Sequence, residues 1–491
     1  MASYSFSGLP EVFASTVEDK HLVQAGLRHG KLRRLRRGLY TTNLRDPLPE
    51  VVRRNLWQIV AHLCPDAVVS HRTALEGRPS TSGFVSVSGS YDRRIELHGL
   101  RIRQLRGPGP LAGDAPFIAG LWMSSRARSL MECLSGKAYG ENSPFLAESA
   151  IEPYLERLLL VGVGTLNDLR DAARELAPHL GLGEELTRLD AMIGALLGTR
   201  VARLQTPSAQ ARSLGWPYDS NRLLLFQSLF DKLVSWPTVG RPDSIVSGPP
   251  FHNLGFFDAY FSNFIEGTEF EVAEAREIVF DNKIPSARPA DAHDVLGTYR
   301  IVGNPASMET RVSALPFAEF INLLRAWHLS IMQGRPEKRP GEFKEVPNQA
   351  GRTLFVDPGL VQGTLKQGLE MLRGLPSPFE RAAFLLFLVS EVHPFDDGNG
   401  RLARAVANAE LVSHLERRIL IPTVFRVEYI DSLRVLSREG QPRTFVRMVD
   451  QAQDFSADID FTDFDLALAR LRAWNAFETD TDDRLSRPPG L

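Results

Sequence analysis

The segment EVHPFDDGNGRLAR, residues 391–404, contains side chains that could together catalyse the transfer of a phosphoryl or nucleotidyl group. His393 is its only side chain with an ordinary pKa near neutrality, so it is the candidate general base. Asp397 is suited to hold Mg²⁺, which proteins bind through one or two carboxylates together with substrate phosphates. This combination predicts a magnesium nucleotide as substrate, and phosphoryl or nucleotidyl transfer as the reaction.

The other residues of the segment predict a site for phosphate. Gly398 and Gly400, on either side of Asn399, let the backbone turn with its N–H groups facing one point, where the following helix presents its positive N-terminus. Arg401 and Arg404 are three residues apart, so they are expected to share a helical face and to clamp phosphate oxygens. A lone histidine or glycine pair would favour an ordinary helix–loop–helix corner, but the convergence of these groups favours a catalytic site.

Two helices must position this loop. The first, SPFERAAFLLFLVSEV, begins with Ser377, Pro378 and Glu380 at the spacing of a capping box, and its apolar residues predict a buried helix. It is expected to end near His393, because a proline disfavours helix in the residue before it. The second helix, GRLARAVANAELVSHL, follows the loop, and Phe395 between them is expected to point into the core.

HPFDDGNGRLAR resembles, without any departure, the signature HxFx(D/E)GNGRxxR of Fic-domain proteins. The resemblance covers roughly residues 205–450 and implies a helical bundle that transfers AMP from ATP to a Ser, Thr or Tyr hydroxyl of a protein target. It implies that His393 deprotonates that hydroxyl, that Asp397 holds Mg²⁺ on the α- and β-phosphates, and that Arg404 meets the terminal phosphates. The implied nucleotide-binding residues are Gly398, Asn399, Gly400, Arg401 and Arg404. Relatives that phosphorylate replace the GNGR portion, so its presence argues for nucleotidyl transfer.

A second segment, YFSNFIEGTEF, resembles the Fic inhibitory motif (S/T)xxxE(G/N). Ser262 and Glu266 are four apart and lie on one helical face, and Gly267 is suited to end the helix. The resemblance implies that Glu266 pairs with Arg404 and takes the place that the γ-phosphate needs. Two alternatives stay open: a coincidental helix end with a solvated glutamate, and a de-AMPylase in which Glu266 directs water to remove AMP.

The segment GEFKEVPNQAGRTLFVDPG, residues 341–359, is typical of a hairpin. It resembles the Fic flap, which adds a target segment as an extra strand beside the active site. Lys344 and Glu345 stand where many relatives carry an Arg–Thr pair, and an ordinary surface hairpin is the alternative. His328 is expected to be a structural helix residue, and no adenine pocket is assigned.

The N-terminal part of the chain is basic. Residues 1–150 carry 20 Lys and Arg against 13 Asp and Glu, while the remainder carries 37 against 46. The segment KLRRLRRGLY is expected to form a hairpin or wing after two or three helices. Its cations would face a phosphate backbone: Lys31, Arg33, Arg34, Arg36 and Arg37.

This region resembles the winged-helix domain of AbiEi-type antitoxins, in RRLRRGLY and in SHRTALEG. The resemblance implies DNA binding and a toxin–antitoxin setting. A protein-docking module is the alternative, and a DNA-binding regulator with a Fic core that only senses nucleotide is a further one.

The expected fold is mainly α, with a helical Fic bundle and its β-hairpin flap behind a small α+β module. The expected domains are a winged-helix-like module with an antiparallel sheet (1–110), a helical extension (111–204), the Fic domain (205–475) and a disordered tail (476–491). Of the 491 residues two are cysteines, neither in a CxxC, which disfavours a disulfide framework. No secretory signal and no bilayer-length apolar run are found, so a cytoplasmic protein without membrane contact is expected. Related autoinhibited enzymes suggest a homodimer.

Overall fold

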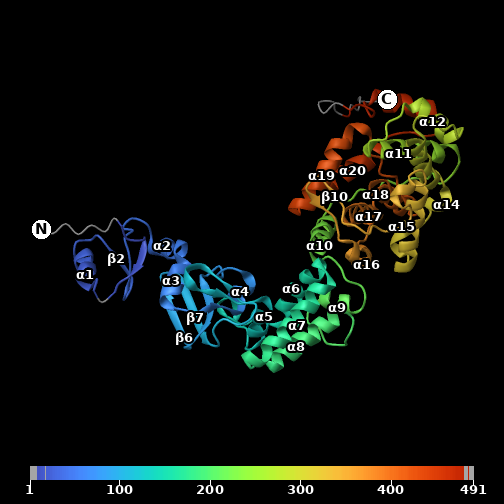
Figure 1. Ribbon diagram of the computed structural model, residues 1–491. Helices are drawn as coiled ribbons and strands as arrows, with labels where there is room; N and C mark the ends of the chain where they lie inside the picture. Colours follow the sequence, from blue (N-terminus) through green and yellow to red (C-terminus); the bar gives the residue numbers. More distant parts are fainter. Residues whose placement is uncertain (1–7, 17, 480–484, 486–491) are drawn as a thin grey trace. The chain divides into compact units, whose positions relative to one another are not determined.

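The computed structural model describes residues 8–16, 18–479 and 485 (Figure 1). It is mainly helical and divides into two compact units, one up to Gly215 and one from Trp216. The division falls later than the boundary expected near residue 205. Helix α9 (Pro207–Ser213) belongs to the first unit, because the N–H groups of Gln205 and Thr206 donate to the Glu152 carboxylate of that unit at 2.7 and 2.6 Å.

The first unit begins with a three-stranded antiparallel sheet in the order β1-β3-β2. The strands are β1 (Val12–Ala14), β2 (Arg33–Arg36) and β3 (Leu39–Thr41). The expected hairpin around Gly38 is confirmed, since β2 and β3 pair. Two or three helices were expected before it, but the described residues of that stretch contain one, α1 (Lys20–Arg28), because Val12–Ala14 pairs with β3 instead.

A six-stranded sheet follows, in the order β6-β7-β5-β4-β9-β8. Its strands are β4 (Val68–Val69), β5 (Phe84–Gly89), β6 (Arg93–Leu97), β7 (Leu100–Arg106), β8 (Ala115–Pro116) and β9 (Trp122–Met123). The expectation of antiparallel pairing is correct for β6 with β7 and wrong for β5 with β7, which are parallel. Alternating side chains reveal strands but not their neighbours, and β5, buried along its length, takes a central position. Strands β8 and β9 lie in the stretch expected to be helical.

Helices make up the rest of the first unit. They are α2 (Leu48–Arg54), α3 (Leu56–Leu63), α4 (His71–Glu76), α5 (Arg126–Leu134), α6 (Glu148–Val161), α7 (Val163–Leu180), α8 (Gly183–Leu196) and α9. Leucine, isoleucine and alanine side chains of α5 to α9 form one buried core.

The second unit is a helical bundle built around α17 and α18 (Figure 1). Its helices are α10 (Ser220–Val234), α11 (Gly248–Ile265), α12 (Val272–Phe280), α13 (Pro289–Val302), α14 (Pro305–Met308), α15 (Phe317–Ile331), α16 (Val361–Leu372), α17 (Pro378–Val392), α18 (Asn399–Val412), α19 (Arg426–Glu439), α20 (Arg443–Ala457) and α21 (Phe464–Ala473). A two-stranded hairpin, β10 (Gln349–Ala350) and β11 (Thr353–Leu354), is also present.

Helix α17 forms as its sequence predicts. The Ser377 hydroxyl accepts from the N–H of Glu380, and the Glu380 carboxylate accepts from the N–H of Ser377, which is the complete capping box. Nearly every side chain of the helix is buried, so α17 and the paired α18 form a fixed base for the loop between them.

The beginning of the expected tail is packed. Ala476 is buried, and the Phe477 ring lies 5.1 Å from the Phe261 ring of α11. Most of the remaining expected tail lies outside the described residues. Among the residues that the structure describes, no helix is both long and apolar enough to cross a membrane.

Candidate functional site

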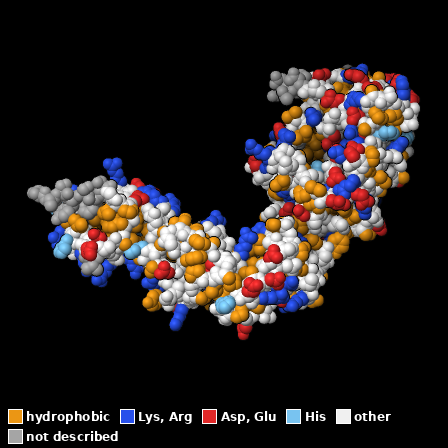
Figure 2. All heavy atoms as spheres, viewed as in Figure 1, with side chains coloured by type: hydrophobic (Ala, Val, Ile, Leu, Met, Phe, Trp, Pro, Cys, Tyr) orange, Lys and Arg blue, Asp and Glu red, His pale blue; other side chains and the backbone are white. Residues whose placement is uncertain are grey.

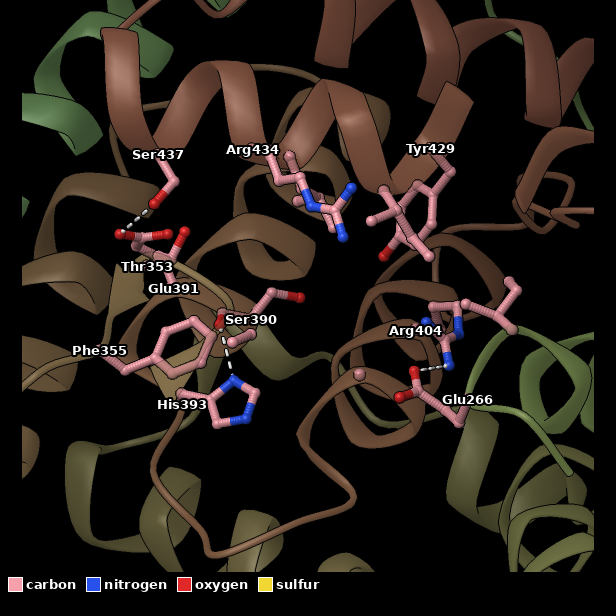
Figure 3. Close-up of a pocket in the computed structure, with 15 residues that line it drawn as sticks. Glu266, Thr353, Phe355, Ser390, Glu391, His393, Arg404, Tyr429, Arg434 and Ser437 are labelled. Carbon is pink, nitrogen blue, oxygen red and sulfur yellow. Dashed lines mark hydrogen bonds and ion pairs between the residues drawn. The ribbon is translucent and has the colours of Figure 1, made fainter. Parts of the chain in front are cut away.

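His393 is held at the end of α17 in a defined orientation. It adopts a left-handed backbone conformation (φ 51°), and its ring stacks on Phe355 with the ring centres 3.8 Å apart. Its Nδ1 donates to the Ser390 carbonyl at 3.1 Å (Figure 3), which fixes the proton on Nδ1. Burial, aided by the charge of Lys344, lowers the pKa of His393 to about 4. The imidazole is therefore neutral at pH 7, and Nε2 keeps a lone pair that can accept a proton.

The side chain of Asn399 shapes the loop. Its amide accepts from the N–H of Phe395 and donates to the Phe395 carbonyl, both at 2.9 Å. Phe395 is buried, as expected, and stacks on His328 with the ring centres 3.8 Å apart. His328 in turn is 2.9 Å from the Asp397 carbonyl and 2.9 Å from the N–H of Gly341. The side chain of Asn399 therefore fixes the turn, and only its backbone N–H is left to serve an anion site.

Two glycines, Gly398 and Gly400, contribute no side-chain atoms at the start of α18. Gly398 is the N-cap residue with φ 73°, and a Cβ there would lie 2.6 Å from the sulfur of Met332. A Cβ on Gly400 would lie only 2.2 Å from Oε1 of Glu266. The carboxylate of Glu266 thus rests against the first turn of α18, where the helix N-terminus favours an anion.

Arg404 joins α18 to α11. Its Nε donates to the Ser262 hydroxyl and its Nη2 to the Ser262 carbonyl, both at 2.8 Å, and Nη2 also donates to Glu266 Oε1 at 2.7 Å. The Arg404 side chain is 5% exposed and that of Glu266 30%. Burial opposes ionisation of Glu266, but Arg404 and Arg401 outweigh it and lower its pKa. Gly267, with φ 90°, turns the chain directly after Glu266. The structure therefore brings Ser262, Glu266 and Arg404 together.

Arg401 lies away from this cluster. Its Nη1 is 2.8 Å from the carboxylate of Asp294 in α13 and 3.3 Å from the side-chain oxygen of Asn263 in α11. The side chain is 3% exposed and Asp294 1% exposed. Although Arg401 and Arg404 are three residues apart, their guanidinium groups diverge because each pairs with a different carboxylate. The structure thus places Arg401 in buried contacts with α13 and α11, apart from the Arg404–Glu266 pair.

Helix α11 is fastened to α18 at three levels. Besides the bonds of Ser262 to Arg404 and Asn263 to Arg401, the Asn408 amide donates to the Asp258 carboxylate at 3.0 Å. All the α11 partners in these bonds are buried. The segment that carries Glu266 is therefore part of the rigid bundle.

A cavity of about 190 Å³ extends from Arg404 and His393 toward α19 (Figure 3). Its apolar and aromatic lining consists of Ile265, Ala350, Phe355, Tyr429, Ile430 and Leu433. Glu391 and Ser437 also line it, and in the view they lie apart from the Arg404–Glu266 pair. The sequence analysis assigned no role to the residues of α19 among them, which are Tyr429, Ile430, Leu433 and Ser437. Their spacing along α19 is a weak signal, because it equals that of any amphipathic helix.

The predicted hairpin forms and is bound at its base to the loop between α17 and α18. The N–H of Lys344 donates to the Pro394 carbonyl at 2.9 Å, and its buried Nζ donates to the side chain of Asn348 at 2.7 Å. Asn348 also donates to the Phe395 carbonyl at 2.9 Å. Burial lowers the pKa of Lys344 to about 8. In contrast, Glu345 is exposed and pairs with an arginine.

Asp397 is the predicted magnesium ligand. It is half-buried, and its Oδ1 accepts from the N–H of Gly398 at 2.7 Å. Within the described part of the chain, no three His, Cys, Asp or Glu side chains are grouped to hold a metal on their own. A single carboxylate beside an anion site fits Mg²⁺, because this ion takes most of its other ligands from water and substrate phosphates.

The basic hairpin of the first unit offers four of its five predicted cations to solvent. Lys31, Arg34, Arg36 and Arg37 are exposed, and Figure 2 shows Lys and Arg side chains projecting from this end of the unit. Arg33 is half-buried, and its Nη1 donates to the Asp46 carbonyl at 2.6 Å. Arg33 is therefore held in the fold by at least one of its guanidinium nitrogens and is less exposed than the other four cations.

Comparisons with known proteins identify a family model and several relatives that match part of this chain. The sequence model of the Fic/DOC family matches residues 320–411. A Fido domain-containing protein of Dictyostelium discoideum is 36% identical over 103 residues, which are 20% of this chain and 72% of that protein. Protein adenylyltransferase fic-1 of Caenorhabditis elegans is 26% identical over 202 residues, 40% of this chain and 39% of that protein. The chain thus matches about two-fifths of the length of this curated relative.

Solved structures were compared as well. Fic-1 from Caenorhabditis elegans aligns with a TM-score of 0.38 and 19% identity, over 67% of this chain and 99% of that one. A Fic domain-containing signaling protein from Bacteroides thetaiotaomicron aligns with a TM-score of 0.39 and 17% identity, over 50% of this chain and 97% of that one.

Proposed function

The chain belongs to the Fic/DOC family, and from this premise we propose that it transfers AMP from magnesium-bound ATP to a hydroxyl side chain of a protein, and that Glu266 inhibits this reaction. The observation that carries the proposal is the Glu266 carboxylate, which pairs with Arg404 against Gly400 at the first turn of α18. A helix N-terminus with a glycine and an arginine is suited to bind phosphate, and here a carboxylate of the same chain lies against it.

His393 is the general base of the proposed reaction. Its neutral Nε2 accepts the proton of a Ser, Thr or Tyr hydroxyl while the hydroxyl oxygen forms a bond to the α-phosphorus of ATP. The bond from that phosphorus to the bridging oxygen breaks, and pyrophosphate leaves. The hydrogen bond from Nδ1 to the Ser390 carbonyl orients the ring and stabilises the imidazolium that forms.

Charge stabilisation comes from the start of α18. Arg404 and the backbone N–H groups after Gly398 would hold the phosphates, and Asp397 would hold Mg²⁺. When bound, Mg²⁺ neutralises phosphate charge. Arg404 cannot pair fully with both Glu266 and a terminal phosphate, so Glu266 and productive ATP compete for one guanidinium.

The hairpin supplies a docking edge for the target. Leu354 lies on the hairpin, in β11, and is 63% exposed. Val346 lies just before β10 and is 70% exposed. A target segment that pairs with this edge would bring its hydroxyl beside His393, whose ring stacks on Phe355 directly after β11.

The test compares the wild type with Glu266→Gly and His393→Ala, each incubated with every labelled nucleoside triphosphate and a lysate. We expect AMP incorporation to rise in Glu266→Gly and to vanish in His393→Ala, as read by mass spectrometry of the modified protein. Glu269→Gly is the matched control, because this exposed glutamate lies three residues further on. If Glu266→Gly only slows hydrolysis of an AMP-modified target, the de-AMPylase reading replaces this one.

A second proposal concerns the first unit, whose exposed cations support DNA binding. We expect the affinity for duplex DNA to fall steeply with salt, and to fall further when Lys31, Arg34, Arg36 and Arg37 are replaced by alanine. Replacing four exposed cations elsewhere in this unit is the control. Equal losses in both variants would contradict a specific role for the hairpin.

A further inference from the structure

One buried carboxyl group in the cavity has no part in the proposed mechanism. Glu391 lies in the last turn of α17, two residues before His393, and lines the cavity. Figure 3 shows its carboxyl group beside Ser437 and Thr353, on the other side of the cavity from Arg404 and Glu266. If phosphates bind at Arg404, this part of the cavity is left for the nucleobase.

The contacts of Glu391 fix its orientation. Arg222 Nη1 lies 3.1 Å from Oε1, and the Ser437 hydroxyl donates to the same oxygen at 3.1 Å. The side chain is 3% exposed. Neither of these two contacts involves Oε2, the second oxygen of the carboxyl group. Burial raises the pKa of Glu391 to about 7, against the opposing charge of Arg222, so the carboxyl group is ionised above that pH.

The walls around Glu391 are also held in place. Arg222, besides contacting Glu391, donates to the Leu354 carbonyl of β11. Arg438 of α19 donates to the Thr353 hydroxyl at 2.8 Å. These bonds tie the hairpin to α10 and α19, so a flat base between the hairpin and α19 would meet a carboxyl group in a fixed position.

We propose that Glu391 determines which nucleobase the site accepts: Oε2 accepts a hydrogen bond from the exocyclic amino group of adenine. An oxo group in the same place would set an acceptor against an acceptor, which leaves both unpaired in a buried site. This inference rests on the proposed function, because it assumes that a nucleotide occupies the cavity with its phosphates at Arg404.

The experiment uses the full chain with Glu266→Gly, so that Arg404 is released, and measures nucleotide binding by calorimetry at pH 8 with magnesium. The probes are ATP, inosine triphosphate, which carries an oxo group in place of the amino group, and purine riboside triphosphate, which carries neither. We expect ATP to bind about 10- to 100-fold more tightly than the other two.

The decisive variant is Glu391→Gln, which has nearly the same shape. Its amide oxygen can still accept from the Ser437 hydroxyl and lie beside Arg222, which leaves the NH₂ group to face the base. We expect this variant to lose its preference for ATP and to favour inosine triphosphate. The control is Glu428→Gln, a change at an exposed glutamate of α19, which keeps the original preference. Thermal unfolding checks that each variant folds.

The outcomes separate the two proposals. If none of the three nucleotides binds, both the proposed function and this inference fail. Binding without a preference for ATP, or a preference that Glu391→Gln leaves unchanged, overturns the inference alone. A reversed preference in Glu391→Gln, with Glu428→Gln unchanged, supports it.

Discussion

Replacing Phe355 by alanine should make the proposed reaction sensitive to mild acid. The Phe355 ring stacks on His393 at 3.8 Å and is part of the enclosure that keeps the imidazole uncharged. Without this ring, water reaches the imidazole, and the charged form is no longer disfavoured by burial. The pKa of His393 should then rise from about 4 toward its ordinary value of 6.5.

The size of the effect follows from these two pKa values. A neutral histidine is required to accept a proton, so the rate follows the neutral fraction. At about pH 5.5, a pKa of about 4 leaves roughly 97% of His393 neutral, whereas a pKa of 6.5 leaves only about 9%. The largest expected loss at this pH is therefore about tenfold, while at about pH 8 both proteins are almost fully neutral at this residue.

The assay is the rate of AMP transfer between pH 5 and 8, measured in the Glu266→Gly background at saturating ATP, so that weaker ATP binding on protonation of Glu391 does not shape the profile. The matched control is Phe343→Ala, because Phe343 packs on Phe395 at 5.1 Å instead of on His393. We expect the acidic limb of the pH–rate profile to move to higher pH only in Phe355→Ala. If the limb stays in place there, or moves equally in the control, burial by Phe355 does not set the pKa of His393.

Two further changes test the surrounding structure. Gly400→Ala should break the Glu266–Arg404 pair without raising AMP transfer, because the new Cβ also fills the proposed anion site; a rise in AMP transfer like that of Glu266→Gly would refute this. Arg401→Met should lower the free energy of unfolding in urea by about 2 kcal/mol, because it removes one of the two arginines that pair with the buried Asp294 and leaves Arg335 in place. The control is Arg434→Met, which removes an arginine from the exposed Arg434–Asp431 pair. It should lower the free energy of unfolding by less than about 1 kcal/mol.

Local sequence signals predicted the elements that hold the site. Ser377, Pro378 and Glu380 fix the start of α17 through contacts within one turn, and Pro394 fixes its end. Such signals involve near neighbours in the chain, so they are legible without a structure.

Features that depend on contacts between residues far apart in the chain were not predicted from the sequence. The guanidinium of Arg401 pairs with Asp294, and no residue near Arg401 in the sequence indicates that this carboxylate is its partner. The parallel pairing of β5 with β7 has the same origin, because alternation marks a strand but not its neighbour. The cavity beside α19 arises only when Tyr429 and Ile430 come to face the hairpin.

The three bonds that fasten α11 to α18 have a kinetic consequence. Since the helix backbone is anchored beside Glu266, the carboxylate can leave Arg404 by rotation about its own side-chain bonds, with no helix displaced. Rotations of unpaired, exposed side chains take picoseconds to nanoseconds, and domain movements take microseconds or longer; the Glu266 rotation adds only the rupture of one ion pair to the former. Relief of inhibition would then track nucleotide concentration without a lag phase.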